Sequence, residues 1–223
     1  MTTDVVIKYR PSFSTLEVEI SPGQSIIAES DAMASMSSNV DIGTRFNGGF
    51  FTALMRKMFG GESLFINEFS IDGGEKGSLV LTQPTPGDIE VVELNNTSLY
   101  LQPGAFVACD PSVDLSLGWA GLASFIGGEG LFRLKVSGQG RVWIGGYGGI
   151  EQVDIKNNYI VDSSHMLAYE PTVRLRVGLS GGIFSSFFGG EGLVTKLTGP
   201  GRVYIQSRSM SGLKAWVNQH LPL

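Results

Sequence analysis

The sequence predicts an all-β fold, arranged as a single domain of three pseudo-repeated modules. The first observation is a repeated tripeptide, Gly-Gly-Glu, which begins at residues 60, 127 and 189, so its copies lie 67 and 62 residues apart. The second is the 31 glycines in 223 residues, which favour turns over long helices because glycine weakens helix interiors and supplies turn positions with positive φ. The third is an apolar content of 42%, enough to fill a sizeable core.

Each Gly-Gly-Glu tripeptide is followed by two apolar runs around a glycine-rich stretch. Alternating and β-branched runs that flank glycines are typical of β-hairpins, so we expect a hairpin after each copy. The expected strand, turn and strand span residues 64–71, 73–77 and 79–81 in the first copy, 131–136, 138–140 and 141–144 in the second, and 193–197, 199–201 and 202–205 in the third.

A second repeated element lies upstream of each tripeptide and consists of a turn followed by an extended apolar segment. Its copies run from Pro22-Gly23 into residues 26–29, from Pro103-Gly104 into 106–109, and from Ser163-Ser164 into 166–169. Chance similarity does not explain two elements that recur three times in the same order. One module of roughly 60–70 residues cannot hide both faces of its strands, whereas three packed modules share one core.

We therefore expect one domain over residues 1–223, with modules at about 12–93, 97–157 and 158–210 and a C-terminal tail at 211–223. The expected architecture is a pseudo-threefold β-barrel or prism with short helical turns. The tail contains a short amphipathic stretch from Leu213 to Leu221.

The run from Leu16 to Arg208 resembles the Aim24-like family. Besides the three Gly-Gly-Glu copies, the matching motifs are Pro86-Gly87-Asp88-Ile89, Gln102-Pro103-Gly104-Ala105-Phe106, Gly146-Tyr147-Gly148-Gly149-Ile150 and the run from Gly199 to Ser209. The resemblance implies a β-rich fold similar to the tryptophan RNA-binding attenuation protein, without that protein's function. It implies no settled activity for prokaryotic members. A mitochondrial relative is associated with inner-membrane organisation, a location that we do not carry over because the N-terminus is not transit-like.

Composition and motifs argue against nucleic-acid binding and against the common catalytic and metal-binding sites. The net charge of −5 argues against a nucleic-acid partner, since nucleic-acid binders usually carry a basic face. No P-loop or Gly-x-Ser-x-Gly elbow occurs, and neither histidine, His165 or His220, belongs to a metal-binding pair. The single cysteine, Cys109, lies in an apolar run and is expected to be buried. We therefore expect no catalytic residues, no cofactor and no metal ligand, in a cytoplasmic protein.

Two further features leave alternatives open. Glu62, Glu129 and Glu191 hold equivalent positions and would either flank their glycine turns in solvent or form a cation-binding ring on the pseudo-threefold axis. Apolar segments precede the three Gly-Gly-Glu copies, with spacings of three and four that indicate short amphipathic turns. They either plug the end of the barrel or form an exposed contact surface.

We take the second view of the apolar segments and predict a non-enzymatic binding or scaffolding protein. It would form a homo-oligomer, or dock on a protein or on a membrane surface as a peripheral protein. The alternatives are a small-ligand or metal-binding β-barrel and an enzyme with an unrecognised site. The predicted interaction residues are Phe50, Phe51, Leu54, Met58, Phe59, Trp119, Leu122, Phe125, Ile126, Ile183, Phe184, Phe187 and Phe188.

Overall fold

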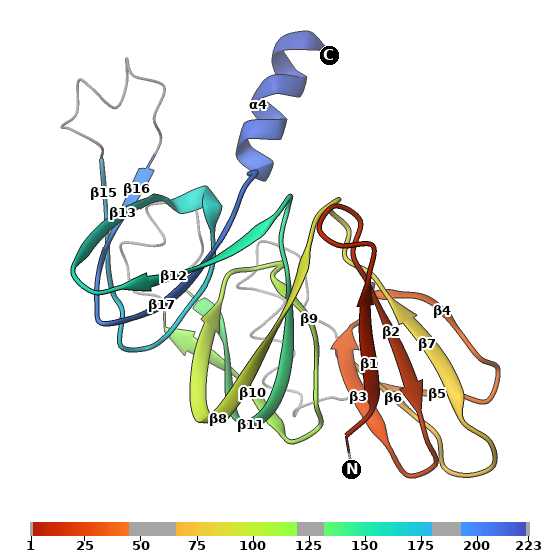
Figure 1. The fold of residues 1–223 in the computed structure, drawn as a ribbon. Coiled ribbons are helices and arrows are strands. Elements are labelled where there is room, and N and C mark those ends of the chain that lie inside the picture. The colour runs from red at the N-terminus through yellow and green to blue at the C-terminus, as the bar shows by residue number, and fades with distance from the viewer. Residues whose placement is uncertain (1, 45–65, 120–131, 180–192, 222–223) are drawn as a thin grey trace.

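The structure is a computed structural model, and it describes residues 2–44, 66–119, 132–179 and 193–221. This part of the chain folds almost entirely into β-strands, with one 3-10 turn and one α-helix (Figure 1). The predicted all-β class is therefore confirmed.

The N-terminal sheet has four antiparallel strands in the order β1-β2-β7-β4. In β2, Leu16, Val18 and Ile20 are buried and alternate with Glu17 and Glu19, as expected for a strand with one face on the core. The strand bounds are β1 Asp4–Lys8, β2 Thr15–Ile20, β4 Met33–Met36 and β7 Gly77–Leu81.

The central sheet has ten strands, in the order β12-β17-β14-β8-β11-β9-β3-β6-β5, and β10 pairs with β11 beside this path. Its centre is the long antiparallel pair of β8 and β11 (Figure 1). The bounds are β3 Ser25–Glu29, β5 Asp41–Thr44, β6 Ile66–Ser70, β8 Ile89–Leu101, β9 Phe106–Cys109, β10 Val113–Trp119, β11 Phe132–Gly145, β12 Ile150–Ile155, β14 Met166–Tyr169 and β17 Gly201–Gln206.

A third sheet contains three antiparallel strands in the order β13-β16-β15. The 3-10 turn η1 leads from β13 into β14, and helix α4 follows β17. The bounds are β13 Asn158–Asp162, η1 Ser163–His165, β15 Arg174–Leu179, β16 Leu193–Thr198 and α4 Met210–His220.

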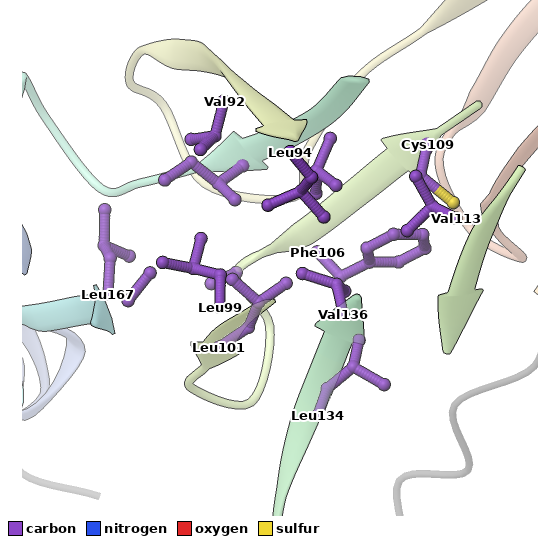
Figure 2. Packing of buried hydrophobic residues seen from close by; sticks show 14 of the residues in the cluster. Val92, Leu94, Leu99, Leu101, Phe106, Cys109, Val113, Leu134, Val136 and Leu167 are labelled. Atoms are coloured by element: carbon purple, nitrogen blue, oxygen red, sulfur yellow. The ribbon is translucent and has the colours of Figure 1, made fainter. Parts of the chain in front are cut away.

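Three clusters of buried apolar side chains lie along this arrangement. The central cluster joins β8, β9 and β11 to Leu167 and Tyr204 of the C-terminal third, and Figure 2 shows Phe106, Leu134 and Val136 within it. One flanking cluster is built mainly from residues 16–81, and the other from residues 155–203. Strands from all three thirds of the chain share this core, since β3, β9 and β14 all contribute to the central cluster.

The closed pseudo-threefold barrel that we expected is not formed by the described strands. A barrel requires its first and last strands to pair. Here the ends of the central sheet, β12 and β5, pair only with β17 and β6 among the strands that the structure describes. The sheets are therefore open.

The three β-hairpins that we expected after the Gly-Gly-Glu copies are also not formed, because in no copy do the two expected strands pair with each other. In the third copy, β16 is flanked by β13 and β15, so neither of its edges is free for β17. In the first copy, β6 and β7 belong to different sheets. In the second copy the expected turn at residues 138–140 lies inside the continuous strand β11, at a bulge where Gly138 and Gly140 have φ of 111° and 144°.

The extended segments after the upstream turns are confirmed as β3, β9 and β14. Gly23 and Gly104 have φ of 77° and 78°, as required of a turn glycine. In two copies an acid after the strand pairs with an arginine. Asp110 accepts from the backbone N and Nε of Arg141 at 2.8 and 3.0 Å, and Glu170 accepts from the same two groups of Arg202 at 2.9 and 2.7 Å.

The start of β8 is held by a polar cluster around Asp88. Its carboxylate accepts from Arg10 Nε at 2.8 Å and Nη2 at 2.9 Å, from Ser14 Oγ at 2.8 Å and from the backbone N of Ile89 at 2.9 Å. Burial raises the pKa of Asp88, but the hydrogen bonds from Arg10 and Ser14 outweigh it and leave that pKa below its ordinary value. The cluster ties the N-terminal segment to the central sheet.

Candidate functional site

The predicted interaction residues fall almost entirely outside the described part of the chain. Only Trp119 lies within it, as the last residue of β10, where its backbone pairs with Phe132 of β11. The three Gly-Gly-Glu copies, with Glu62, Glu129 and Glu191, also lie outside the described residues.

The strands that lead into the three apolar segments are arranged alike. Each segment joins two consecutive strands that pair antiparallel, namely β5 with β6, β10 with β11, and β15 with β16. The last paired residues before the segments are Thr44 with Asn67, Trp119 with Phe132, and Leu179 with Leu193.

Helix α4 carries several exposed apolar side chains. It has no buried residue, and it stands away from the sheets in Figure 1. Met210, Leu213, Trp216 and Leu221 are all exposed, Trp216 by 57%. The helix starts at Ser209, whose Oγ accepts from the backbone N of Gly212 at 3.1 Å. The amphipathic stretch seen in the sequence is thus a helix with an uncovered apolar side.

The outward face of the third sheet carries three cationic side chains. Arg174 and Arg176 lie on β15, and Lys196 lies on β16 directly opposite Arg176. All three line a groove of about 460 Å³, beside Ile160 of β13. Like charges that lie opposite each other on paired strands destabilise a sheet. Within the described residues, none of the three side chains forms an ion pair that would offset this repulsion. This face is therefore suited to contact a negatively charged surface.

A second, larger groove of about 1000 Å³ lies between the first turn of α4, η1 and the loops around Gly104 and Gly146. Gln102 lies in its wall and is only 9% exposed, and its Nε2 has no hydrogen-bond partner. Sequence reasoning placed Gln102 in a turn motif and missed its buried amide. The position of Gln102 directly before the Pro103-Gly104 turn was the only feature of the sequence that could have indicated it.

The side chains best suited to catalysis, two histidines and a cysteine, are either within hydrogen-bond distance of a backbone carbonyl or buried. Nδ1 of His165 is 2.8 Å from the carbonyl oxygen of Gln206, and Nδ1 of His220 is 2.8 Å from that of Trp216. Cys109 is buried, as expected from its apolar run. Within the described ranges, no three His, Cys, Asp or Glu side chains gather as a metal ion would require.

The described residues form a mostly β fold with exposed apolar side chains on α4 and three cationic side chains on the third sheet. The chain belongs to the family described as "Mitochondrial biogenesis AIM24", whose model matches residues 5–208. The resemblance seen in the sequence is thereby confirmed.

Two relatives from Streptococcus pyogenes extend the comparison. The chain is 29% identical over 219 residues to the uncharacterized protein M6_Spy0233 of serotype M6, covering 94% of this chain and 88% of the relative. Its fold is similar to the crystal structure of protein SPYM3_0169, with a TM-score of 0.79 and 26% identity, covering 98% of this chain and all of that one. In the described part of the chain, no helix combines the length and apolar character needed to cross a bilayer.

Proposed function

We propose that this chain is a non-enzymatic binding protein that docks on a partner surface through its uncovered apolar residues. The observation that carries the proposal is α4, an eleven-residue helix without a buried residue. A helix of this length gains most of its stability from packing its apolar side. Contact with a partner would supply that packing for Met210, Leu213 and Trp216.

The three apolar segments of the sequence extend the same proposal. Each joins a pair of antiparallel strands, and this shared connection supports a three-module arrangement in which the segments have equivalent roles. Residues 183–188 come after β15 in the sequence, and β15 is the strand that carries Arg174 and Arg176. A chain that carries both apolar segments and exposed cations suits a partner that is both apolar and anionic, either another protein or the surface of a membrane.

The non-enzymatic part of the proposal rests on the groups that catalysis would need. Both histidines have Nδ1 within hydrogen-bond distance of a backbone carbonyl, and the thiol of Cys109 is inaccessible. A nucleophilic cysteine would require exposure and a cationic neighbour.

Light scattering and vesicle flotation test this function. The wild-type chain and a Leu213→Ser/Trp216→Ser variant are compared, with Phe13→Ser, an exposed apolar position near the N-terminus, as the control. We expect the wild type to self-associate or to float with vesicles that contain phosphatidylglycerol, and the α4 variant to lose that behaviour while the control keeps it. A wild-type monomer that ignores vesicles, or an α4 variant that behaves as the wild type, contradicts the proposal.

A further inference from the structure

We propose that the groove on the outward face of the third sheet binds a small phosphate monoester. The inference rests on the proposed function as a binding protein and names the anionic group that the groove recognises, but it makes no use of α4. The groove has a volume of about 460 Å³, within the range of small-ligand sites. Its cations are Arg174, Arg176 and Lys196, and no Asp or Glu is among the described residues that line it.

The three cations lie close together on one face of the sheet. Arg174 and Arg176 are two residues apart on β15, so their side chains project to the same side at a spacing of about 7 Å. Lys196 of β16 lies directly opposite Arg176, at a position where Cβ atoms are about 5 Å apart. All three side chains are exposed and line the same groove, so their charged groups can reach one bound anion.

Protection of a sheet edge does not explain all three cations. Charged side chains on an edge strand hinder its pairing with other chains, and the order β13-β16-β15 makes β15 an edge strand. This explanation fits Arg174 and Arg176. It does not fit Lys196, because β16 is flanked by β13 and β15. A cation at this central position adds repulsion without protecting an edge.

Lysines of the N-terminal sheet provide a comparison within the same chain. Lys8 of β1 lies 2.6 Å from a carboxylate oxygen of Glu17 on the neighbouring strand β2. Lys76, directly before β7, forms an ion pair with Glu19 of β2. On the third sheet, the residue opposite Arg176 is instead a second cation. Charges that the described strands leave uncompensated indicate a site that an anion completes.

The number of cations determines the charge of the ligand. A carboxylate or a phosphodiester carries one negative charge, whereas a phosphate monoester carries about −1.5 to −2 at pH 7 and offers three acceptor oxygens. A guanidinium group donates paired hydrogen bonds to phosphate oxygens, and an ammonium group binds phosphate as a point charge. Two guanidinium groups and one ammonium group therefore match a monoester better than they match a monoanion.

The rest of the groove fits a short hydroxylated carbon chain. Oγ1 of Thr198 donates to Oδ1 of Asn158 at 3.1 Å, so the NH₂ group of Asn158 is the part of this amide that can donate to a ligand hydroxyl. Ile160 lies opposite Lys196 and is 60% exposed, and Tyr159 also lines the groove. These two side chains can cover the carbon atoms of the ligand. A glycerol phosphate or a sugar phosphate has all of these features.

Isothermal titration calorimetry of the full chain with sn-glycerol 3-phosphate tests this site. We expect the wild type to bind, and Lys196→Gln should weaken binding by about threefold to tenfold because one charged partner of the phosphate is lost. The matched control Lys76→Gln also removes one positive charge, but from the N-terminal sheet, and should bind as the wild type does. Lys196→Gln should leave Tm equal or higher, since it removes the repulsion with Arg176, so weaker binding would not reflect unfolding.

Further probes separate the monoester from other anions and identify its source. Glycerol 3-sulfate has a similar shape but one negative charge, and it should bind more weakly. Vesicles that contain phosphatidic acid present the same monoester on a lipid, and they are tested with the Leu213→Ser/Trp216→Ser variant so that docking through α4 does not contribute. Binding of the free ester assigns a soluble ligand, and binding of these vesicles alone assigns a lipid headgroup, so either result supports the monoester.

The α4 variant should also bind wherever the wild type does, which keeps this site distinct from a failure of the docking proposal. The absence of binding to both the ester at millimolar concentration and the phosphatidic acid vesicles overturns the inference. Equal binding of the sulfate, or a Lys196→Gln variant that binds as the wild type does, overturns it as well.

Discussion

Replacing Asp110 with alanine should reduce the free energy of unfolding by about 3–5 kcal/mol, the usual effect of removing one partner of a buried ion pair. The Asp110 side chain is 2% exposed and that of Arg141 is 23% exposed, with Oδ1 and Nη2 2.8 Å apart. Without the carboxylate, the partly buried guanidinium keeps one hydrogen bond, from Nη2 to the carbonyl oxygen of Thr3 at 2.9 Å, and its contact with the ring of Trp143.

The equivalent pair in the C-terminal third provides the control. Glu170 also accepts from the backbone N and Nε of its arginine, Arg202, but the two side chains are 25% and 42% exposed. Because solvent screens this pair, Glu170→Ala should reduce stability by about 1 kcal/mol or less. The predicted difference between the two variants therefore comes from burial and from one further hydrogen bond, which Asp110 accepts from Nη2 of Arg141 at 2.8 Å.

Urea unfolding followed by tryptophan fluorescence measures both effects, since Arg141 lies 4.8 Å from the ring centre of the buried Trp143. A double-mutant cycle with Arg141→Ala separates the pair from the other contacts of each residue. Equal losses for Asp110→Ala and Glu170→Ala, or a loss of less than about 1 kcal/mol for Asp110→Ala, would refute the reasoning from burial.

Three other changes have expected outcomes. The pKa of Asp88 is lowered in the folded chain, so its carboxylate stabilises the fold at any pH above the ordinary aspartate pKa of about 3.9. This stabilisation is lost as the pH falls through the pKa of the folded state, and Asp88→Asn should therefore make Tm decrease less steeply in acid. Gly87→Ala should prevent folding at moderate temperature, because its Cβ would lie 2.0 Å from the carbonyl oxygen of Gly146, whereas Gly73→Ala meets nothing within 4 Å and should leave Tm unchanged by thermal melting. Ser209→Ala should reduce the helical circular dichroism signal of α4 without lowering Tm, since the cap contributes about 1 kcal/mol to a helix that has no buried residue.

The sequence predicted individual strands better than their pairing. Strands β3, β9 and β14 could be recognised because each follows a turn and contains at least three consecutive apolar residues, a pattern that burial on both faces produces. The partners of a strand depend on which edges are free. The apolar run of β17 does not reveal that β13 and β15 already occupy both edges of β16.

Glycines caused the other main error. Gly138 and Gly140 both have positive φ, which a turn and a β-bulge require equally, so the sequence could not distinguish the two. The unpartnered amide of Gln102 was equally hidden, because the lack of a hydrogen bond depends on the packing of residues distant in the chain. The apolar stretch in the C-terminal tail was visible, since helical spacing is a local property.

Solvent contact of Trp216 tests the docking proposal most directly. With 5-fluorotryptophan in all three tryptophan positions, the ¹⁹F signal of Trp216 should respond to exchange of H₂O for D₂O in the free chain and lose that response in the self-associated or vesicle-bound form. The signal of Trp143 should respond in neither state, because this side chain is buried. If the Trp216 signal keeps its full solvent response in every assembly that the chain forms, α4 is not the contact and the account is wrong.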